Sequence, residues 1–329
     1  MAIPQCDMAM ASPASGGAWQ NSRSPLLIRL AMLTQSAPRI RHFDGLSPHG
    51  FHRVCYFEWG DPSNAQVVIG VHGLSRNGRD FDVLGEALAS THRVLAPDMP
   101  GRGRSEWLAQ AEDYVATTYL TTLTALIAAS GADTVSWVGT SMGGLLGMAL
   151  AAQPNTPIAR LVLNDVGPVV EAPALARIGE YLGADRAFAT YAEIEAYVRT
   201  ISAPFGPLTD AQWAHLTRTN VRQDADGRWR VGYDPKIAVP FKATPPPRDL
   251  WALWDRVACP VLALRGQRSD VLSRETAGAM AERGPRARVV EIDGVGHAPA
   301  LLDCAQVDRV AAFLRAGPGD DPSRTIGAA

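Results

Sequence analysis

The sequence predicts an α/β fold in which a mostly parallel central sheet is flanked by helices and carries an inserted helical cap. Short β-branched runs alternate with runs of helical spacing, first within residues 37–168 and again within 248–316. Such alternation is typical of a parallel sheet with helices on both faces. Between these two stretches, residues 169–247 show helical patterns and almost no strand patterns. The chain of 329 residues is long enough to bury a substantial core.

In the first stretch, β-prone runs predict strands and apolar residues at helical spacing predict helices. The run 67–71 is continuously apolar and β-branched, which favours a strand buried on both faces of a parallel sheet. The strands are expected at 52–59, 67–71, 94–96, 134–138 and 161–163, and the helices at 81–89, 114–129 and 141–152. In the second stretch, strands are expected at 261–264 and 287–292, and helices at 274–283 and 299–314.

The cap is predicted at 169–247, with helices at 174–182, 191–200 and 210–220 and a strand signal at 228–233. It closes at the proline run 245–247. Segments inserted after strand ends emerge over the crevice where ligands bind, so the cap should roof the site. Trp213 and Trp229 are its candidates for lining a substrate pocket, although bulky cap side chains more often pack within the cap.

The ends of the chain lack periodic apolar patterns. Residues 1–36 are rich in Ala, Ser, Pro, Gly and Met and are expected to form a disordered leader, with Met32 as an alternative start to Met1. Residues 317–329 are expected to form a flexible tail.

The composition argues against several classes of partner. Apolar residues make up 47% and charged residues 19%, and the net charge of −2 indicates neither a nucleic acid nor a membrane as partner. No apolar run is long enough to cross a bilayer, and no clear signal-peptide cleavage site follows the apolar stretch near residue 30, so we expect a cytoplasmic location. The four cysteines show no metal-ligand spacing.

The stretch Gly139-Thr140-Ser141-Met142-Gly143 lies between a predicted strand and a predicted helix. This is the strand–turn–helix context of a G-x-S-x-G nucleophile elbow, in which a strained turn raises the serine hydroxyl above the sheet. Glycine at the flanking positions leaves room for the neighbouring strand and helix. Ser141 is therefore the candidate nucleophile.

A seryl hydroxyl needs a base, and the base needs an orienting group. His297 lies in a glycine-bracketed loop after the last predicted strand, and it is the candidate base. Asp270 follows the strand predicted at 261–264 and is the preferred orienting acid. Asp165, which comes just after the strand that follows the elbow, is the alternative. Asp98 is expected to hold its own glycine-rich loop through hydrogen bonds to the backbone.

An oxyanion formed during acyl transfer must meet preorganised donors. The Met142 N–H, directly after the nucleophile, and the Leu74 N–H, in the loop after strand 67–71, are the candidates. Arg76 and Arg79 in that loop are candidate ligands for a substrate carboxylate, or they pair with the neighbouring Asp80 and Asp82.

Taken together, the chain resembles α/β-hydrolase fold enzymes of the capped serine esterase type. The resemblance rests on His72-Gly73, the loop 98–105, the elbow, Ser269-Asp270 and Gly296-His297, in that order. It implies the order nucleophile, acid, base for Ser141, Asp270 and His297, and it implies neither a metal nor an organic cofactor.

The expected function is hydrolysis of a small carboxylic ester through an acyl-enzyme. A carbon–carbon bond hydrolase or an enol-lactonase would use the same residues and remains open as the alternative. A non-enzymatic binding protein is disfavoured, because all three members of a triad are present. The expected partner is a small-molecule ester, and the oligomeric state is open.

Overall fold

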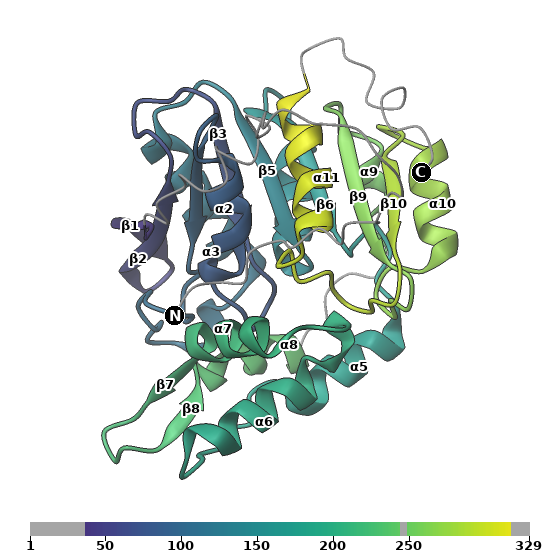
Figure 1. Cartoon of the computed structure of the whole chain (residues 1–329). Helices are drawn as coiled ribbons and strands as arrows, with labels where there is room; N and C mark the ends of the chain where they lie inside the picture. Colours follow the sequence, from purple (N-terminus) through teal and green to yellow (C-terminus); the bar gives the residue numbers. More distant parts are fainter. Residues whose placement is uncertain (1–36, 244–248, 317–329) are drawn as a thin grey trace, which may run out of the picture.

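The structure is a computed structural model that describes residues 37–243 and 249–316 (Figure 1). The predicted leader 1–36, the tail 317–329 and the proline run 245–247 lie outside the described residues.

Within the described residues, the central sheet has eight strands in the order β1-β2-β4-β3-β5-β6-β9-β10. They are β1 (Arg39–Ser47), β2 (Gly50–Trp59), β3 (Val67–Val71), β4 (Arg93–Pro97), β5 (Val135–Thr140), β6 (Ile158–Asn164), β9 (Val261–Gly266) and β10 (Arg288–Ile292). β2 pairs antiparallel with β1 and β4, and the remaining pairs are parallel. The predicted fold class is therefore confirmed.

The α-helices among the described residues are α2 (Asp82–Leu88), α3 (Ala116–Ser130), α4 (Met142–Ala151), α5 (Ala172–Tyr181), α6 (Tyr191–Ile201), α7 (Asp210–Asn220), α8 (Ala238–Ala243), α9 (Trp251–Trp254), α10 (Arg274–Glu282) and α11 (Cys304–Arg315). Short 3₁₀ turns occur at η1 (Gly78–Phe81), η2 (Ala111–Asp113), η3 (Ala203–Phe205) and η4 (Pro235–Ile237), and β7 (Val221–Gln223) pairs antiparallel with β8 (Trp229–Val231).

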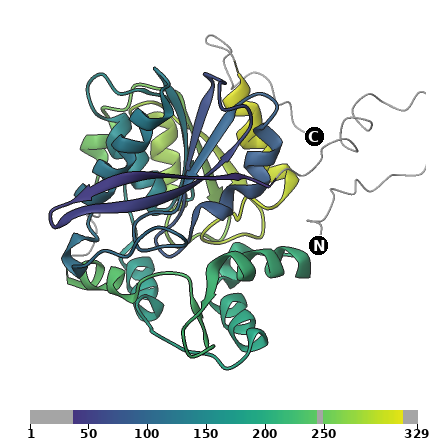
Figure 2. The same ribbon diagram turned by 90° about the vertical axis from the view of Figure 1, so that its left-hand side faces the viewer.

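Helices flank both faces of the sheet (Figure 2), and two clusters of buried apolar side chains form a layer on either face. Leu84 of α2 and Val310 of α11 belong to one core cluster, and Leu123 of α3 and Leu146 of α4 belong to the other. Side chains along a strand point alternately to the two faces. In β3, accordingly, Ile69 packs in the second layer and Val68 in the first, and the whole strand is buried.

Most predicted core elements lie within a few residues of their observed bounds, and β3 matches the prediction at both ends. The antiparallel edge strand β1 was not predicted, because most of its side chains are exposed and it has no continuous apolar run. The short helices α8 and α9 were also missed.

The segment from α5 to α8 lies together at one end of the sheet (Figures 1 and 2). We call residues 172–243 the cap segment. Within residues 37–243 and 249–316, no helix is long and apolar enough to cross a membrane. The cytoplasmic location stays a prediction.

Candidate active site

Ser141 occupies the sharp turn between β5 and α4, with φ 51° and ψ −114°. This positive φ is a strained conformation for a residue with a side chain. Close packing explains the two flanking glycines: a Cβ at Gly139 would collide with the Gly143 carbonyl, and one at Gly143 with the Val71 carbonyl. The elbow is further tied to the sheet because the Ser141 N–H donates to the Asn164 carbonyl of β6, at 3.1 Å.

His297 lies within hydrogen-bond distance of both Ser141 and a carboxylate. Its Nε2 is 2.9 Å from Ser141 Oγ, and its Nδ1 is 2.7 Å from Asp165 Oδ2. An acid at Nδ1 keeps the proton on that nitrogen and leaves Nε2 free to accept the seryl proton. The three side chains thus form a continuous chain of hydrogen bonds from a buried acid to a partly exposed hydroxyl.

The structure contradicts the expected position of Asp270 beside His297. The carboxylate that holds the His297 ring belongs to Asp165, the first residue after β6, whereas Asp270 forms a bidentate ion pair with Arg177 of α5. Asp165 is fully buried, while the Asp270 side chain is 42% exposed. The preference for Asp270 is wrong because its side chain faces the cap segment.

Asp165 is held by the loop that was expected to supply the acid. The Gly266 N–H donates to Asp165 Oδ1 at 2.7 Å, and the Ser269 hydroxyl donates to Oδ2 at 2.6 Å. These donors compensate for burial of the carboxylate and leave Oδ2 beside His297. Ser269, the first residue of the Ser269-Asp270 motif, therefore contacts the carboxylate that holds the His297 ring.

Two buried side chains, those of His72 and Arg102, hold the loop after β3 in place. This loop carries the candidate oxyanion donor Leu74. His72 Nε2 accepts from the Met99 N–H at 2.9 Å, so its Nδ1 carries the proton and donates to the Gly73 carbonyl. Burial lowers the pKa of His72 to about 3, and the ring therefore stays neutral as it bridges the two loops. Buried Arg102 donates from Nε to the Leu74 carbonyl at 2.9 Å.

Leu74 lines the same pocket as Ser141, and Met142 is the first residue of α4. Within the described residues, neither backbone N–H donates a hydrogen bond to another group. Unpaired N–H groups at a helix N-terminus favour a negative charge. Both candidates thus have a free donor.

Asp98 stabilises its glycine-rich loop as predicted. Its two oxygens accept from the Gly78 and Arg104 N–H groups at 2.8 and 2.7 Å. Burial raises the pKa of Asp98 to about 6.

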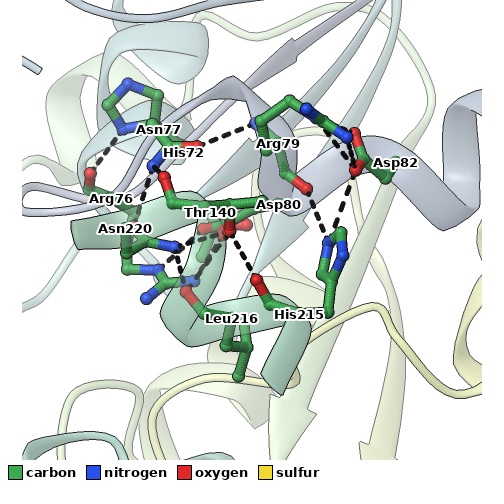
Figure 3. A network of polar contacts seen from close by, with 12 residues as sticks. His72, Arg76, Asn77, Arg79, Asp80, Asp82, Thr140, His215, Leu216 and Asn220 are labelled. Atoms are coloured by element: carbon green, nitrogen blue, oxygen red, sulfur yellow. Dashed lines mark hydrogen bonds and ion pairs between the residues drawn. The ribbon is translucent and has the colours of Figure 1, made fainter. Parts of the chain in front are cut away.

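The cap segment and the core line one pocket around Ser141 and His297. Apolar side chains predominate on the cap side, and those that line the pocket include Ile178, Val198, Ile201, Phe205, Leu216 and Val231. Cap helix α7 also docks on the core, because the side-chain amide of Asn77 donates to the Thr219 carbonyl and to Asn220 Oδ1 (Figure 3). The cap segment and the loop after β3 are thereby joined.

The two loop arginines differ. Arg76 lines the pocket and pairs with Asp80, its Nε donating to Oδ2 at 2.9 Å. Arg79 does not line that pocket and instead pairs with buried Asp82, which also lies 3.5 Å from His215 Nε2 (Figure 3). The prediction that Arg79 binds a substrate carboxylate is therefore wrong.

Neither tryptophan proposed for the pocket lines it. Trp213 is buried in a small cluster with Leu216 and Leu302, and Trp229 packs edge-on against the Tyr191 ring. Both residues pack within the cap or between cap and core. The aromatic side chains that do line the pocket are Tyr181, Phe205 and Tyr233.

In the part of the chain that the structure describes, no group of three or more His, Cys, Asp and Glu side chains is arranged to hold a metal ion.

Comparisons with known proteins agree with this architecture. Residues 68–313 match the model of the alpha/beta hydrolase family. A 3-hydroxybutyrate-oligomer hydrolase from Cupriavidus necator is 46% identical over 281 residues, which cover 83% of this chain and 96% of that protein. Esterase YbfF from Escherichia coli is 26% identical over 254 residues, covering 71% of this chain and 87% of the relative.

Among solved structures, an alpha/beta hydrolase from Novosphingobium aromaticivorans superposes with a TM-score of 0.77 at 37% identity, covering 85% of this chain and 98% of that one. The chain belongs to the alpha/beta hydrolase family. Its relatives further place it among the carboxylic-ester hydrolases.

Proposed function

We propose that this enzyme cleaves small carboxylic esters by a serine mechanism in which Ser141, His297 and Asp165 form the catalytic triad. The observation that carries the proposal is the chain of hydrogen bonds from Ser141 Oγ to His297 Nε2, at 2.9 Å, and from His297 Nδ1 to Asp165, at 2.7 Å. This is the geometry in which an imidazole activates a serine.

In the first half of the reaction, Ser141 Oγ attacks the ester carbonyl carbon while its proton passes to His297 Nε2. The tetrahedral oxyanion accepts hydrogen bonds from the Leu74 and Met142 N–H groups. When the bond to the alcohol oxygen breaks, His297 gives that oxygen its proton, and the acyl group stays on Ser141.

In the second half, water attacks the acyl carbonyl and its proton passes to His297 Nε2. Collapse of the second tetrahedral species breaks the bond to Ser141 Oγ, which takes the proton back, and releases the acid. Throughout, Asp165 fixes the imidazole tautomer and stabilises its charged form.

We propose oligomers of 3-hydroxybutyrate as the first substrates to test. The support is the Cupriavidus necator relative, which is named for these esters and which aligns with 83% of this chain. The largely apolar cap side of the pocket suits the methyl-bearing carbon chain of such an oligomer.

The proposal is tested with Ser141→Ala, with Ser63→Ala on an exposed loop as the matched control. Ser141→Ala should lower kcat by roughly 10⁴-fold or more and abolish covalent labelling by a fluorophosphonate. The control should keep both. The substrate panel contains acyl esters of increasing length, 3-hydroxybutyrate oligomers, an enol-lactone and a dione. Labelling of another serine, or turnover of the dione alone, would contradict the proposal.

A further inference from the structure

Two guanidinium groups line the pocket that contains Ser141 and His297: Arg76 from the loop after β3 and Arg177 from cap helix α5. Apolar side chains predominate on the cap side of the pocket, and Asp80 is the carboxylate among its lining residues. A cation at the wall of a mostly apolar pocket recognises an anionic group on the ligand.

Arg177 is oriented by the carboxylate that does not serve the triad. Its Nε donates to Asp270 Oδ2 at 2.6 Å and its Nη2 donates to Oδ1 at 2.9 Å. Within the described residues, Nη1 has no hydrogen-bond partner. One edge of the planar group is thus fixed on the core, and the remaining donors are left for a ligand.

Arg76 has less room for a ligand than Arg177. Its side chain is 12% exposed, compared with 33% for Arg177. It lies over the Phe205 ring, 5.4 Å from the ring centre, and its partner Asp80 also lines the pocket. A carboxylate near Arg76 would meet the negative charge of Asp80.

On the basis of the proposed ester hydrolysis, we propose that Arg177 binds a free carboxylate of the substrate and that Asp270 positions Arg177 for this contact. The enzyme then prefers esters that carry a carboxylate over neutral esters of the same shape. A linear oligomer of a hydroxy acid has such a group at one end. Because Asp270 already neutralises Arg177, the preference comes from directed hydrogen bonds more than from long-range attraction.

The experiment compares two substrates that differ only in charge: the linear dimer of 3-hydroxybutyrate and its terminal carboxamide. The wild-type enzyme should show a kcat/KM about 10- to 100-fold higher for the acid, as one charge-assisted hydrogen-bonding contact provides. Arg177→Met should lower kcat/KM for the acid by about that factor, mainly through KM, and change it less than about 3-fold for the amide.

Two further variants separate binding from other effects. Arg186→Met removes an exposed arginine of the cap segment that does not line the pocket, and it should leave the ratio between the two substrates unchanged. The double variant Arg177→Met/Asp270→Asn removes the repulsion from an unpaired Asp270, and its kcat/KM should be about equal for acid and amide.

Three results would overturn the inference: no preference for the acid in the wild-type enzyme, an equal loss on both substrates in Arg177→Met, or a double variant that regains the wild-type preference. Fluorophosphonate labelling of Ser141 distinguishes these from failure of the proposed function. If labelling and hydrolysis of simple esters persist, only the carboxylate contact is wrong. If both are absent, the serine mechanism is wrong, and the inference with it.

Discussion

Two neighbouring strands, β6 and β9, each end near an aspartate, and the two carboxylates have different environments. Asp165 follows β6 directly, is fully buried and accepts hydrogen bonds from Gly266, Ser269 and His297. Asp270 lies four residues beyond the end of β9, is 42% exposed and pairs with Arg177 of the cap segment. Position after a strand brings both acids to the same edge of the sheet, but they contact different partners there.

Backbone conformation contributes to the difference. Asp165 has a φ of 58°, in the left-handed region, and its N–H donates to the Leu264 carbonyl of β9 at 2.8 Å. A residue held this close to two strands has few alternative positions for its side chain. Asp270 is carried by a surface loop, where a bidentate arginine orients the carboxylate outward.

Replacing the carboxylate that holds His297 should have a much larger effect on kcat than replacing Asp270. Asp165→Asn should lower kcat by about 10⁴-fold, because an amide beside Nδ1 favours the wrong imidazole tautomer. Asp270→Asn should lower kcat by less than about 10-fold on a neutral ester, since its carboxylate does not contact His297. Steady-state kinetics of the two variants on a p-nitrophenyl ester make the measurement. Equal losses would show that the two acids share the role.

Sequence patterns predicted the elbow and the histidine loop well because both depend on local chemistry. The glycines around Ser141 indicate a turn that passes close to other backbone, and residues 139–143 alone are enough to predict it. The choice between Asp165 and Asp270 depends on Arg177, a residue far away in the chain that draws one carboxylate toward the cap. No local pattern contains that information.

The pocket lining was less predictable for the same reason. Trp213 and Trp229 have the bulk expected of pocket walls, but their helix and strand turn them into packing contacts. Arg76 and Arg79 lie in the same short loop, so their local sequences do not distinguish them. Arg79 pairs with Asp82, which is buried in the core, whereas Arg76 lines the pocket.

Ser269 contacts one of the two acids and is the sequence neighbour of the other, so its replacement should have a smaller effect on kcat than that of Asp165. Ser269→Ala removes the hydroxyl that donates to Asp165 Oδ2 at 2.6 Å, although Ser269 is the direct neighbour of Asp270. Loss of one hydrogen bond to a charged group should lower kcat by about 10- to 100-fold. The matched control is Ser273→Ala, which removes the N-cap of α10 and should reduce thermal stability with kcat nearly unchanged. If both serines lower kcat alike, Ser269 acts through the stability of its loop.

The Arg177–Asp270 pair should add little to the stability of the fold. The Arg177 and Asp270 side chains are 33% and 42% exposed, so solvent screens their attraction, and Asp270→Asn should lower the free energy of unfolding by less than about 1 kcal/mol.

Arg177 holds the pKa of Asp270 below its usual value against the opposing effect of burial. A carboxyl with a depressed pKa in the folded state stabilises the fold fully above its unfolded pKa and loses that contribution as the pH falls through the folded pKa. The difference between wild type and variant in urea unfolding should therefore stay constant from pH 8 to about pH 5, shrink only below about pH 4, and diminish in 1 M salt. A difference of several kcal/mol that resists salt would instead make this pair a buried structural contact between cap and core, and would remove the contrast with Asp165.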